Sequence, residues 1–421
     1  MMAENKNIPE IRFAGFIDPW EQRKLADVLS SYTDPVEIPH TGYERLGIRS
    51  HAKGTFHSYV PAGHELQTAQ MHKVAADKFI VNITFGWEHA VAVTDENDAG
   101  KLVSHRFPQF SLSEELDPKF LKFIILDENF RHHLWLASPG GAGRNRVLNL
   151  TEMLQYEIYI PSVSEQRQIA DVLIRLDNLI TLHQRRYDQL KNVKKSMLEK
   201  MFPRNGANVP EIRFAGFTNA WEQRKFSDTF STLQNNTLSR AELSQEEGSA
   251  LNVHYGDILI KYGEILDVSV AALPYIPNAD LVSKFKNSIL EDGDVIMADT
   301  AEDETVGKCS EVLNLQGKPT ISGLHTIPCR PVMKFAPGYL GYYMNSGAYH
   351  DQLLPLMQGI KVTSISKSAL QNTVLSWPTS IDEQTKIGQY FMNLDNLITL
   401  HQCKCDKLKE IKNSLLQKMF V

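Results

Sequence analysis

Cationic, polar and aromatic side chains gather in two loops of the first third of the chain. YERLGIRSHAKGTFHSY (43–59) and the glycine-rich GGAGRNRV (140–147) supply a first set of candidate nucleic-acid contacts: Tyr43, Arg45, Arg49, His51, Lys53, His57, Arg144, Asn145 and Arg146. Arginine can bind a guanine edge with two hydrogen bonds or hold a phosphate, and lysine suits a phosphate. These residue types indicate DNA contact, although a solvated surface loop is the alternative interpretation of each residue.

The second half of the chain has loops of the same kind with different residues. LVSKFKNS (281–288) and MQGIKVTSIS (357–366) supply the second set of candidate contacts: Lys284, Lys286, Gln358, Lys361, Thr363 and Ser364. Lysines, amides and hydroxyls can bind phosphates or base edges. We therefore predict a nucleic-acid surface here as well, with the same alternative.

No motif for catalysis, nucleotide binding or metal binding accompanies these loops. TVGKC (305–309) has a Gly-Lys pair but lacks the upstream glycine and the following Ser or Thr of a P-loop. The sequence has no G-x-S-x-G nucleophile motif, and its fourteen histidines do not fall at metal-ligand spacings. We therefore predict no catalytic residue and no metal site.

The composition is typical of a globular protein with two or three domains. The 421 residues carry a net charge of −6, and 42% of them are hydrophobic, which is enough to bury a core in each domain. Cys309, Cys329, Cys403 and Cys405 form no C-x-x-C pair, which favours a reducing compartment. Because no apolar run reaches the length of a membrane span or signal sequence, the expected location is the cytoplasm.

The chain is built from two repeats whose ends are closely similar. PEIRFAGF occupies 9–16 and 210–217, and WEQRK occupies 20–24 and 221–225, both at an offset of 201. LDNLITLHQ occupies 176–184 and 394–402, and KMF ends both repeats, at an offset of 218. The stretches between these shared ends do not correspond. Similar frames around unrelated inserts suggest one scaffold that presents two different binding surfaces; inserts that diverged without functional meaning are the alternative.

Each repeat ends in a long amphipathic helix, predicted over 164–202 and 380–421, with Ser164 as the expected N-cap of the first. Apolar residues recur at spacings of three and four, as in a coiled-coil seam. The predicted seam residues are Ile169, Leu173, Leu176, Ile180, His183, Tyr187, Leu190, Ile387, Phe391, Leu394, Ile398, His401 and Leu408. Helices of about 38 residues would be about 57 Å long and need a partner, so each is expected to pack against the other. A buried, hydrogen-bonded pair is the favoured interpretation of His183 and His401, ahead of metal binding.

The inserts are predicted to be α+β domains of one fold. In the first repeat, short strands are predicted within 78–94 and 156–161, with a helix that begins near Asp117 and Pro118. In the second, strands are predicted at 257–263, 292–300, 320–331 and 373–378, with a helix near 337–354. The predicted boundaries are 1–160 for the first domain, 161–203 for the central helix, 204–379 for the second domain (linker 203–210) and 380–421 for the C-terminal helix.

Together these motifs resemble the specificity subunits of type I DNA restriction–modification systems. The resemblance rests on WEQRKLAD and WEQRKFSD at the start of each insert, and on SEQRQIADVLIRLDNLI (164–180) and DEQTKIGQYFMNLDNLI (382–398) near the start of each long helix. DGDVIMADT (292–300) followed by TISGLHTIPCRP (320–331) is similar to paired strands of the family's recognition domains. The resemblance covers essentially the whole chain.

The resemblance implies an α+β protein in which two α/β target-recognition domains are separated by two long helices, which form an antiparallel, pseudo-twofold coiled coil. Each domain would read one half of a bipartite, asymmetric site in double-stranded DNA. The helix pair would set the spacer and dock two modification (methyltransferase) subunits, which restriction (translocase and nuclease) subunits join. S-adenosylmethionine, ATP and Mg would belong to those partners, and this chain would bind no cofactor. A structural adaptor whose inserts bind proteins is the alternative function.

Overall fold

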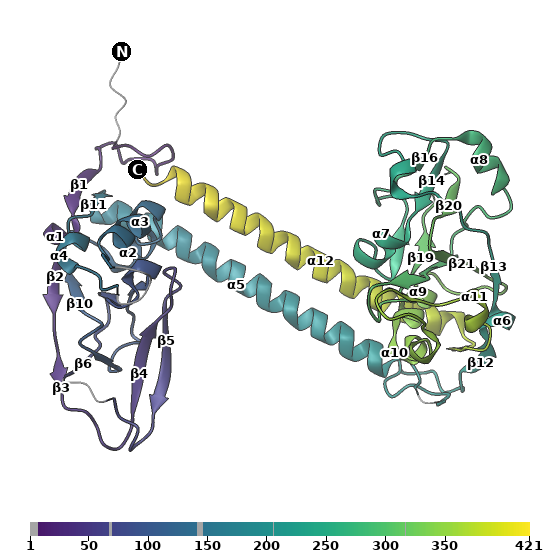
Figure 1. Ribbon diagram of the computed structural model, residues 1–421, viewed down its shortest axis with the longest axis horizontal. Coiled ribbons are helices and arrows are strands. Elements are labelled where there is room, and N and C mark those ends of the chain that lie inside the picture. The colour runs from purple at the N-terminus through teal and green to yellow at the C-terminus, as the bar shows by residue number, and fades with distance from the viewer. Residues whose placement is uncertain (1–6, 67–69, 141–145, 205, 316) are drawn as a thin grey trace, which may run out of the picture. The chain divides into compact units, whose positions relative to one another are not determined.

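The computed structural model describes residues 7–66, 70–140, 146–204, 206–315 and 317–421. Two compact units divide the chain: residues up to His183 with Lys404–Val421 form unit 1, and Gln184–Cys403 form unit 2. Each unit holds one insert and parts of two long helices, α5 (Val163–Lys200) and α12 (Ile381–Lys418) (Figure 1). Each long helix therefore contributes to both units.

Both units are built around the same antiparallel sheet. Its strand order in unit 1 is β2 (Leu29–Tyr32), β10 (Gln109–Leu112), β7 (Lys78–Val81) and β8 (Val91–Val93). In unit 2 the order is β13 (Phe230–Thr232), β21 (Thr326–Pro331), β17 (Val295–Ala298) and β19 (Cys309–Leu313), with β15 (Ile265–Asp267) added parallel to β19. The inserts thus share a core sheet although their residues do not correspond.

A second sheet distinguishes the two inserts. In unit 1 it has five strands in the order β3 (Pro35–Val36), β6 (Met71–Lys73), β9 (Leu102–Ser104), β4 (Tyr43–Ile48) and β5 (Thr55–Val60). Unit 2 has a three-stranded sheet of β16 (Tyr275–Ile276), β14 (Ala250–Val253) and β20 (Thr320–Ser322), and a short ribbon of β18 (Thr300–Ala301) and β22 (Thr363–Ser364). The predicted α+β class is confirmed, and the inserts differ in the outer sheets.

Short helices pack on the shared sheet of unit 1. Where the sequence predicted one helix from Asp117, the structure has two, α2 (Pro118–Ile124) and α3 (Glu128–Leu136). Asp117 caps the first by accepting a hydrogen bond from Lys119 N, and Asp127 caps the second in the same way, which is why the helix breaks between them. The other short helices of this insert are α1 (Leu25–Val28), η1 (Gly86–Glu88) and α4 (Leu150–Met153).

In unit 2 the predicted strand at 257–263 is wrong, because this segment begins in helix α7 (Tyr255–Ile260). The His254 side chain accepts a hydrogen bond from Gly256 N and caps this helix. A short apolar run such as ILI has no periodicity that distinguishes a strand from a helix. The helix forms here because the His254 side chain caps its first turn. The other short helices are α6 (Phe226–Thr229), η2 (Arg240–Glu242), α8 (Ala279–Lys284), α9 (Tyr339–Asn345), α10 (Gly347–His350), η3 (Leu354–Leu356) and α11 (Lys367–Leu370).

A two-stranded antiparallel sheet brings the two ends of each insert together. In unit 1 it pairs β1 (Glu21–Lys24) with β11 (Glu157–Ile160), and in unit 2 it pairs β12 (Glu222–Lys225) with β23 (Val374–Trp377). The EQRK stretch that both repeats share forms the first strand each time. The chain then passes from the second strand directly into a long helix.

The two long helices pair in antiparallel fashion within each unit (Figure 1). In unit 1, Lys412 Nζ of α12 lies 2.6 Å from Asp177 Oδ1 of α5. In unit 2, Lys194 Nζ of α5 lies 2.6 Å from Asp395 Oδ1 of α12. The early part of each helix thus meets the late part of the other, which confirms the predicted antiparallel pair. The first helix begins two residues earlier than its expected cap implied, because Ser162 accepts a hydrogen bond of 3.4 Å from Glu165 N.

Candidate nucleic-acid interface

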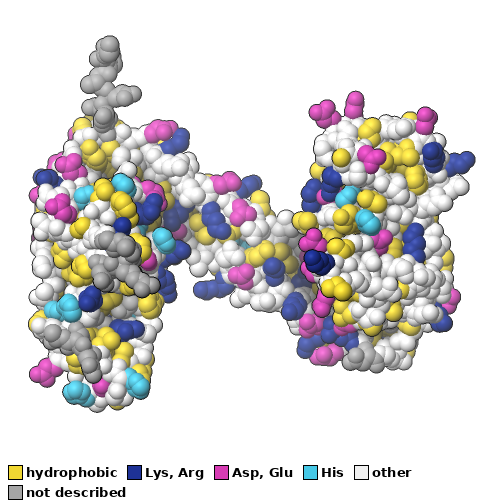
Figure 2. Space-filling view, viewed as in Figure 1, with side chains coloured by type: hydrophobic (Ala, Val, Ile, Leu, Met, Phe, Trp, Pro, Cys, Tyr) yellow, Lys and Arg dark blue, Asp and Glu magenta, His cyan; other side chains and the backbone are white. Residues whose placement is uncertain are grey.

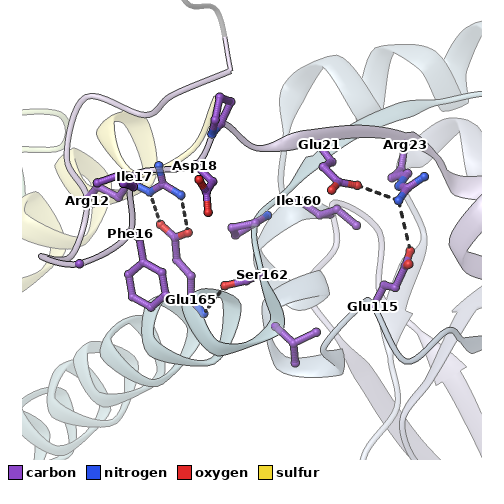
Figure 3. Close-up of a pocket in the computed structure, with 14 residues that line it drawn as sticks. Arg12, Phe16, Ile17, Asp18, Glu21, Arg23, Glu115, Ile160, Ser162 and Glu165 are labelled. Carbon is purple, nitrogen blue, oxygen red and sulfur yellow. Dashed lines mark hydrogen bonds and ion pairs between the residues drawn. The ribbon is translucent and has the colours of Figure 1, made fainter.

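A buried ion pair fastens each opening segment, 9–16 or 210–217, to the first turn of a long helix. In unit 1 the Arg12 guanidinium donates to both carboxylate oxygens of Glu165, at 2.6 and 2.8 Å (Figure 3). In unit 2 Arg213 binds Glu383 with the same two distances. The hydrogen bond to Glu165 raises the pKa of Arg12. The shared EIR and EQ motifs are therefore the two halves of one contact.

The glutamine that follows this glutamate ties the helix to its insert. Gln166 accepts a hydrogen bond of 2.8 Å from Asp117 N at the start of α2 and donates to Pro161 O. Gln384 accepts one of 3.0 Å from Ala336 N and donates to Pro378 O. Because both glutamines are buried, each amide must find partners, and in both units it finds them on the insert.

The residue just before the arginine of each opening segment is bound to the end of the other long helix. Ile11 N donates to Lys418 O at the end of α12, and Ile212 N donates to Lys200 O at the end of α5, each at 2.9 Å. These bonds satisfy carbonyls that a helix end leaves without intrahelical partners. Each opening segment therefore links the start of one long helix to the end of the other.

A cavity of about 320 Å³ lies beside the first opening segment (Figure 3). Its polar wall includes Arg23, which lies 2.7 Å from Glu21 and 3.8 Å from Glu115. Arg12 and Glu165 also line it and are already paired with each other. Because both arginines on this wall are paired with carboxylates of the chain, we assign no ligand to the cavity.

The predicted seam residues differ in depth along the long helices. Those buried are Ile169, Leu173, Ile387, Phe391 and Leu394, and those partly buried are Leu176, Ile180, His183, Tyr187, Leu190, Ile398, His401 and Leu408. The most deeply buried ones lie near the start of each helix, where an insert also covers it. Beyond that point the seam residues are only partly buried, although Leu190 still packs against the core of the second insert.

The hairpin turn between β4 and β5 carries three of the candidate contacts at the surface of unit 1. Arg49, His51 and Lys53 are all exposed, and among the described residues none of them forms an ion pair. The Arg49 guanidinium lies 5.3 Å from the ring of Phe56 and donates to Thr55 O, which holds it along the hairpin. This turn offers cations that can meet phosphate.

The turn is fixed against the segment that contains η1. His51 N and Ala52 N donate to the carbonyls of Glu88 and His89, at 2.9 and 2.8 Å. His51 and Ala52 have positive φ angles of 60° and 49°. Residues with a side chain rarely adopt such angles unless surrounding contacts hold the backbone there. The exposed cations therefore stand on a braced turn.

Arg146 comes to the same segment from the other candidate loop. Its guanidinium carbon lies 4.9 Å from the ring of Trp135 and 5.8 Å from the ring of Trp87 in η1. Sequence reasoning missed both tryptophans, because Trp135 is 11 and Trp87 is 59 residues away from Arg146 and no local pattern marks them. Arg144 and Asn145 lie outside the described residues. Cation–π contacts with these rings orient the Arg146 guanidinium, which forms no ion pair with any acidic residue that the structure describes.

The remaining candidates of unit 1 are buried, half-buried or already bound to another residue. Tyr43 is a correction, because it is buried in a small core with Met71 and Leu102 and cannot reach a ligand. Arg45 is half-buried on β4. The His57 ring is bound to Asp98, with Nε2 at 2.7 Å from Oδ1. The alternating pleat of β4 turned Tyr43 inward, and only the sheet's register could reveal that.

In unit 2 the structure brings together four of the six candidates and leaves two apart. Gln358, Lys361, Thr363 and Ser364 lie on one loop, closed by backbone hydrogen bonds in both directions between Gln358 and Ser364. Lys284 and Lys286 are exposed at the end of α8, beside Phe285, which packs on the three-stranded sheet. No hydrogen bond or ion pair between described residues joins the two groups.

The surface charge is mixed on both units. Figure 2 shows acidic and basic side chains interspersed over the visible face, without one large patch of either sign. The described residues contain no group of three or more His, Cys, Asp or Glu side chains that could hold a metal ion. In the described part of the chain, no helix is both long and apolar enough to cross a lipid bilayer.

Comparison with known proteins gives a family-model match over part of the chain. The type I restriction modification DNA specificity domain matches residues 18–192. The type I restriction enzyme MjaVIII specificity subunit of Methanocaldococcus jannaschii is 21% identical over 266 residues, which are 62% of this chain and 60% of that protein. The match thus spans less than two thirds of the relative's length.

One solved structure shares the fold over nearly the whole chain. The type I restriction-modification system S subunit from M. genitalium superimposes with a TM-score of 0.50 at 14% identity, over 98% of this chain and 99% of that one. The HsdS subunit from Thermoanaerobacter tengcongensis gives a TM-score of 0.46 at 17% identity, over 95% and 96%. Residues 18–192 are therefore similar to the type I restriction modification DNA specificity domain, and the chain shares its fold with the M. genitalium S subunit.

Proposed function

We propose that this chain is the DNA sequence-specificity subunit of a type I restriction–modification complex, and that it has no catalytic activity of its own. Each insert would read one half of a bipartite, asymmetric site. One observation carries the proposal: the frame is repeated contact for contact, as in Arg12–Glu165 and Arg213–Glu383, while the exposed loops share no residues. A frame of this kind suits two readers of different sequences.

The chemistry of the loops supports DNA as the ligand. Arg49, Lys53 and Arg146 in unit 1 and Lys361 in unit 2 form no ion pair among the described residues, so they are available to phosphates or bases. Long helices of 38 residues, about 57 Å at 1.5 Å per residue, would span more than one turn of DNA and set the spacer.

The helices also offer a surface for two copies of one partner. LDNLITLHQ is identical in α5 and α12, and the identity includes residues that face solvent. Leu179 and Leu182 are 43% and 51% exposed, and their equivalents Leu397 and Leu400 are 43% and 46% exposed. Helix packing requires only the seam, so identical exposed leucines favour an outside partner that binds twice. We assign them to the two modification subunits, which would bring S-adenosylmethionine; ATP and Mg would come with the restriction subunits.

Exchange of one insert tests the reading of half-sites. Residues 26–150 would be replaced by the insert of a related chain, and the methylated sites would be mapped across the genome of a host that supplies the modification subunits. The expected result is a new sequence in one half of the site, with the other half and the spacer kept. A change in both halves, or in neither, would overturn the one-insert, one-half-site proposal.

Charge placed on the exposed leucines tests docking. Leu182→Glu and Leu400→Glu should each remove one of two modification subunits, and the double variant should remove both, as counted by native mass spectrometry of the purified complex. Lys195→Glu, at an exposed position on the opposite flank of α5, is the matched control and should keep both. Two subunits retained in the double variant would remove the leucines from the docking surface.

The adaptor alternative makes a different prediction for DNA. With modification subunits present, a DNA-reading chain should bind duplex with an affinity that falls steeply as salt is raised, because phosphate contacts release counterions. An adaptor should show no such binding in a filter assay at two salt concentrations.

A further inference from the structure

One turn of unit 2, next to the candidate loop 358–364, has a strained and partly exposed histidine. His325 lies between β20 and β21 with a φ of 55°, a left-handed backbone that a residue with a side chain rarely adopts. Strain of this kind persists where surrounding structure imposes it and is concentrated at functional sites. The His325 side chain is 47% exposed, so packing in a hydrophobic core does not explain the presence of a histidine at this position.

The ring of His325 is held on one edge and open on the other. Its Nδ1 lies 3.3 Å from Asp299 Oδ1 and 3.4 Å from Thr300 Oγ1. Its Nε2 makes no hydrogen bond with any part of the chain that the structure describes. Because Nδ1 faces a carboxylate, it carries the hydrogen, and the neutral imidazole presents Nε2 as an acceptor in a defined direction.

An aromatic neighbour supports the ring from the side. Tyr255 meets His325 edge to face at a centroid distance of 5.3 Å and packs on His254 at 4.7 Å. His254 is in turn near Arg240, whose guanidinium binds the buried Asp257 at 2.8 Å. This row of side chains fixes the tyrosine, and the tyrosine limits the rotamers of His325.

The backbone connects this histidine to the loop already proposed to contact DNA. Asp299 N donates to His325 O at 3.1 Å, and Ile365 N donates to Asp299 O at 2.9 Å. In the ribbon that follows, Thr300 of β18 pairs with Ser364 of β22. His325, Thr300 and Ser364 therefore stand on one hydrogen-bonded platform.

We propose that His325, supported by Tyr255, contacts a base edge in the half-site read by unit 2. This inference rests on the proposed function and names a specificity-determining residue for it. The Nε2 of the neutral imidazole can accept from an amino group of cytosine or adenine, and the Nε2 of the protonated imidazole can donate to guanine O6 or N7. It was not among the sequence-based candidates, because nothing in SGLHTIP shows that this turn meets loop 358–364.

The surroundings favour a base over a phosphate as the partner of His325. The side chains of the platform are the Thr300 and Ser364 hydroxyls and the His325 imidazole, which suit base edges, and the Asp299 carboxylate beside them does not bind phosphate. The next turn carries Glu302, Asp303 and Glu304, all exposed, and such carboxylates repel phosphate. Substitution of His325 should therefore alter sequence preference without altering how affinity depends on salt.

The variant His325→Gly separates a reading role from a structural one. Glycine adopts a positive φ without strain, so this variant should fold at least as stably as the parent chain. In the complex with modification subunits, we expect specific affinity to fall about 5- to 150-fold, the range for one lost base contact, with an unchanged salt slope. Methylation mapping should show relaxed preference at one position of the unit 2 half-site only. His64→Ala, at an exposed histidine of unit 1, is the matched control.

Each outcome has a distinct meaning. A folded His325→Gly variant that keeps full affinity and full preference at every position would overturn the inference. A weaker affinity with a shallower salt slope would make His325 a phosphate contact and would also overturn it. If insert exchange changes one half-site as expected while His325→Gly changes nothing, this inference fails and the proposed function stands. If the parent complex methylates no bipartite site, the proposed function itself fails.

Discussion

Replacing Arg12 by alanine should open the frame of unit 1 and leave that of unit 2 closed. The Arg12 side chain is 12% exposed and Glu165 is fully buried, so the change leaves a buried carboxylate without its two hydrogen bonds from Arg12. Removing one partner of a buried ion pair costs about 3–5 kcal/mol. Two hydrogen bonds to charged groups, at about 1.5–3 kcal/mol each, give a similar sum.

Amide hydrogen exchange measures this cost where it acts. Ile11 N–H is bonded to Lys418 O, so the peptide 9–16 reports on attachment of the opening segment. A loss of about 4 kcal/mol corresponds to nearly a thousandfold increase in the population of the open segment, at about 1.4 kcal/mol for each tenfold. The peptide 210–217 is an internal control, because its own pair, Arg213–Glu383, is intact.

The reverse substitution and a double substitution complete the design. Arg213→Ala should accelerate exchange in 210–217 and spare 9–16. Arg12→Met combined with Glu165→Met should recover much of the protection, since it removes the unpaired charge. If Arg12→Ala accelerates exchange in 9–16 by less than tenfold, or accelerates both peptides equally, the ion pair does not fasten the segment as we argue.

Two further predictions follow from unit 2 and from the chain ends. Burial raises the pKa of Glu311 to about 7, although the hydrogen bonds from Gly341 N and Gly338 N oppose this rise. Between about pH 4.5 and 7 the folded state therefore keeps a proton on Glu311 that the unfolded state releases. The stability of unit 2 should therefore fall by about 3 kcal/mol as pH rises from about 4.5 to 7, and denaturant unfolding of Glu311→Gln should lack this dependence. Joining the chain's two ends through a short linker and opening it at 204–207 should give a folded, active subunit, because Ile11 already binds Lys418; a permuted chain that fails to melt cooperatively would contradict this.

Features that repeat along the sequence could be predicted, and contacts between distant residues could not. The two long helices follow from a three-and-four spacing, which is a local property. Arg12 and Glu165 are 153 positions apart in the sequence. The repeated EIR and EQ motifs could therefore be recognised, but the contact between them could not be predicted. The break between α2 and α3 followed from Asp127, a cap that lies inside an otherwise helical pattern.

The candidate interface shows the same division. Charged loops were recognisable by composition, and Arg49, Lys53 and Lys361 do lie at the surface. Tyr43 could not be excluded without the pleat of β4, and Trp87 and His325 could not be included without the sheets that carry them to the loops. Residue type suggests what a side chain could bind, whereas strand register decides whether it is accessible.

On the proposed function, the two inserts would contact DNA through different groups. In unit 1 the exposed groups include cations held by aromatic rings, which suit phosphate and would give an affinity that depends on salt. In unit 2 the hydroxyls and the imidazole around His325 would suit base edges, and the exposed Lys284, Lys286 and Lys361 would suit phosphate. Because the frame that carries them is the same in both units, the difference between them lies in the inserts alone. We infer that each insert can be replaced independently of the other while the frame is kept.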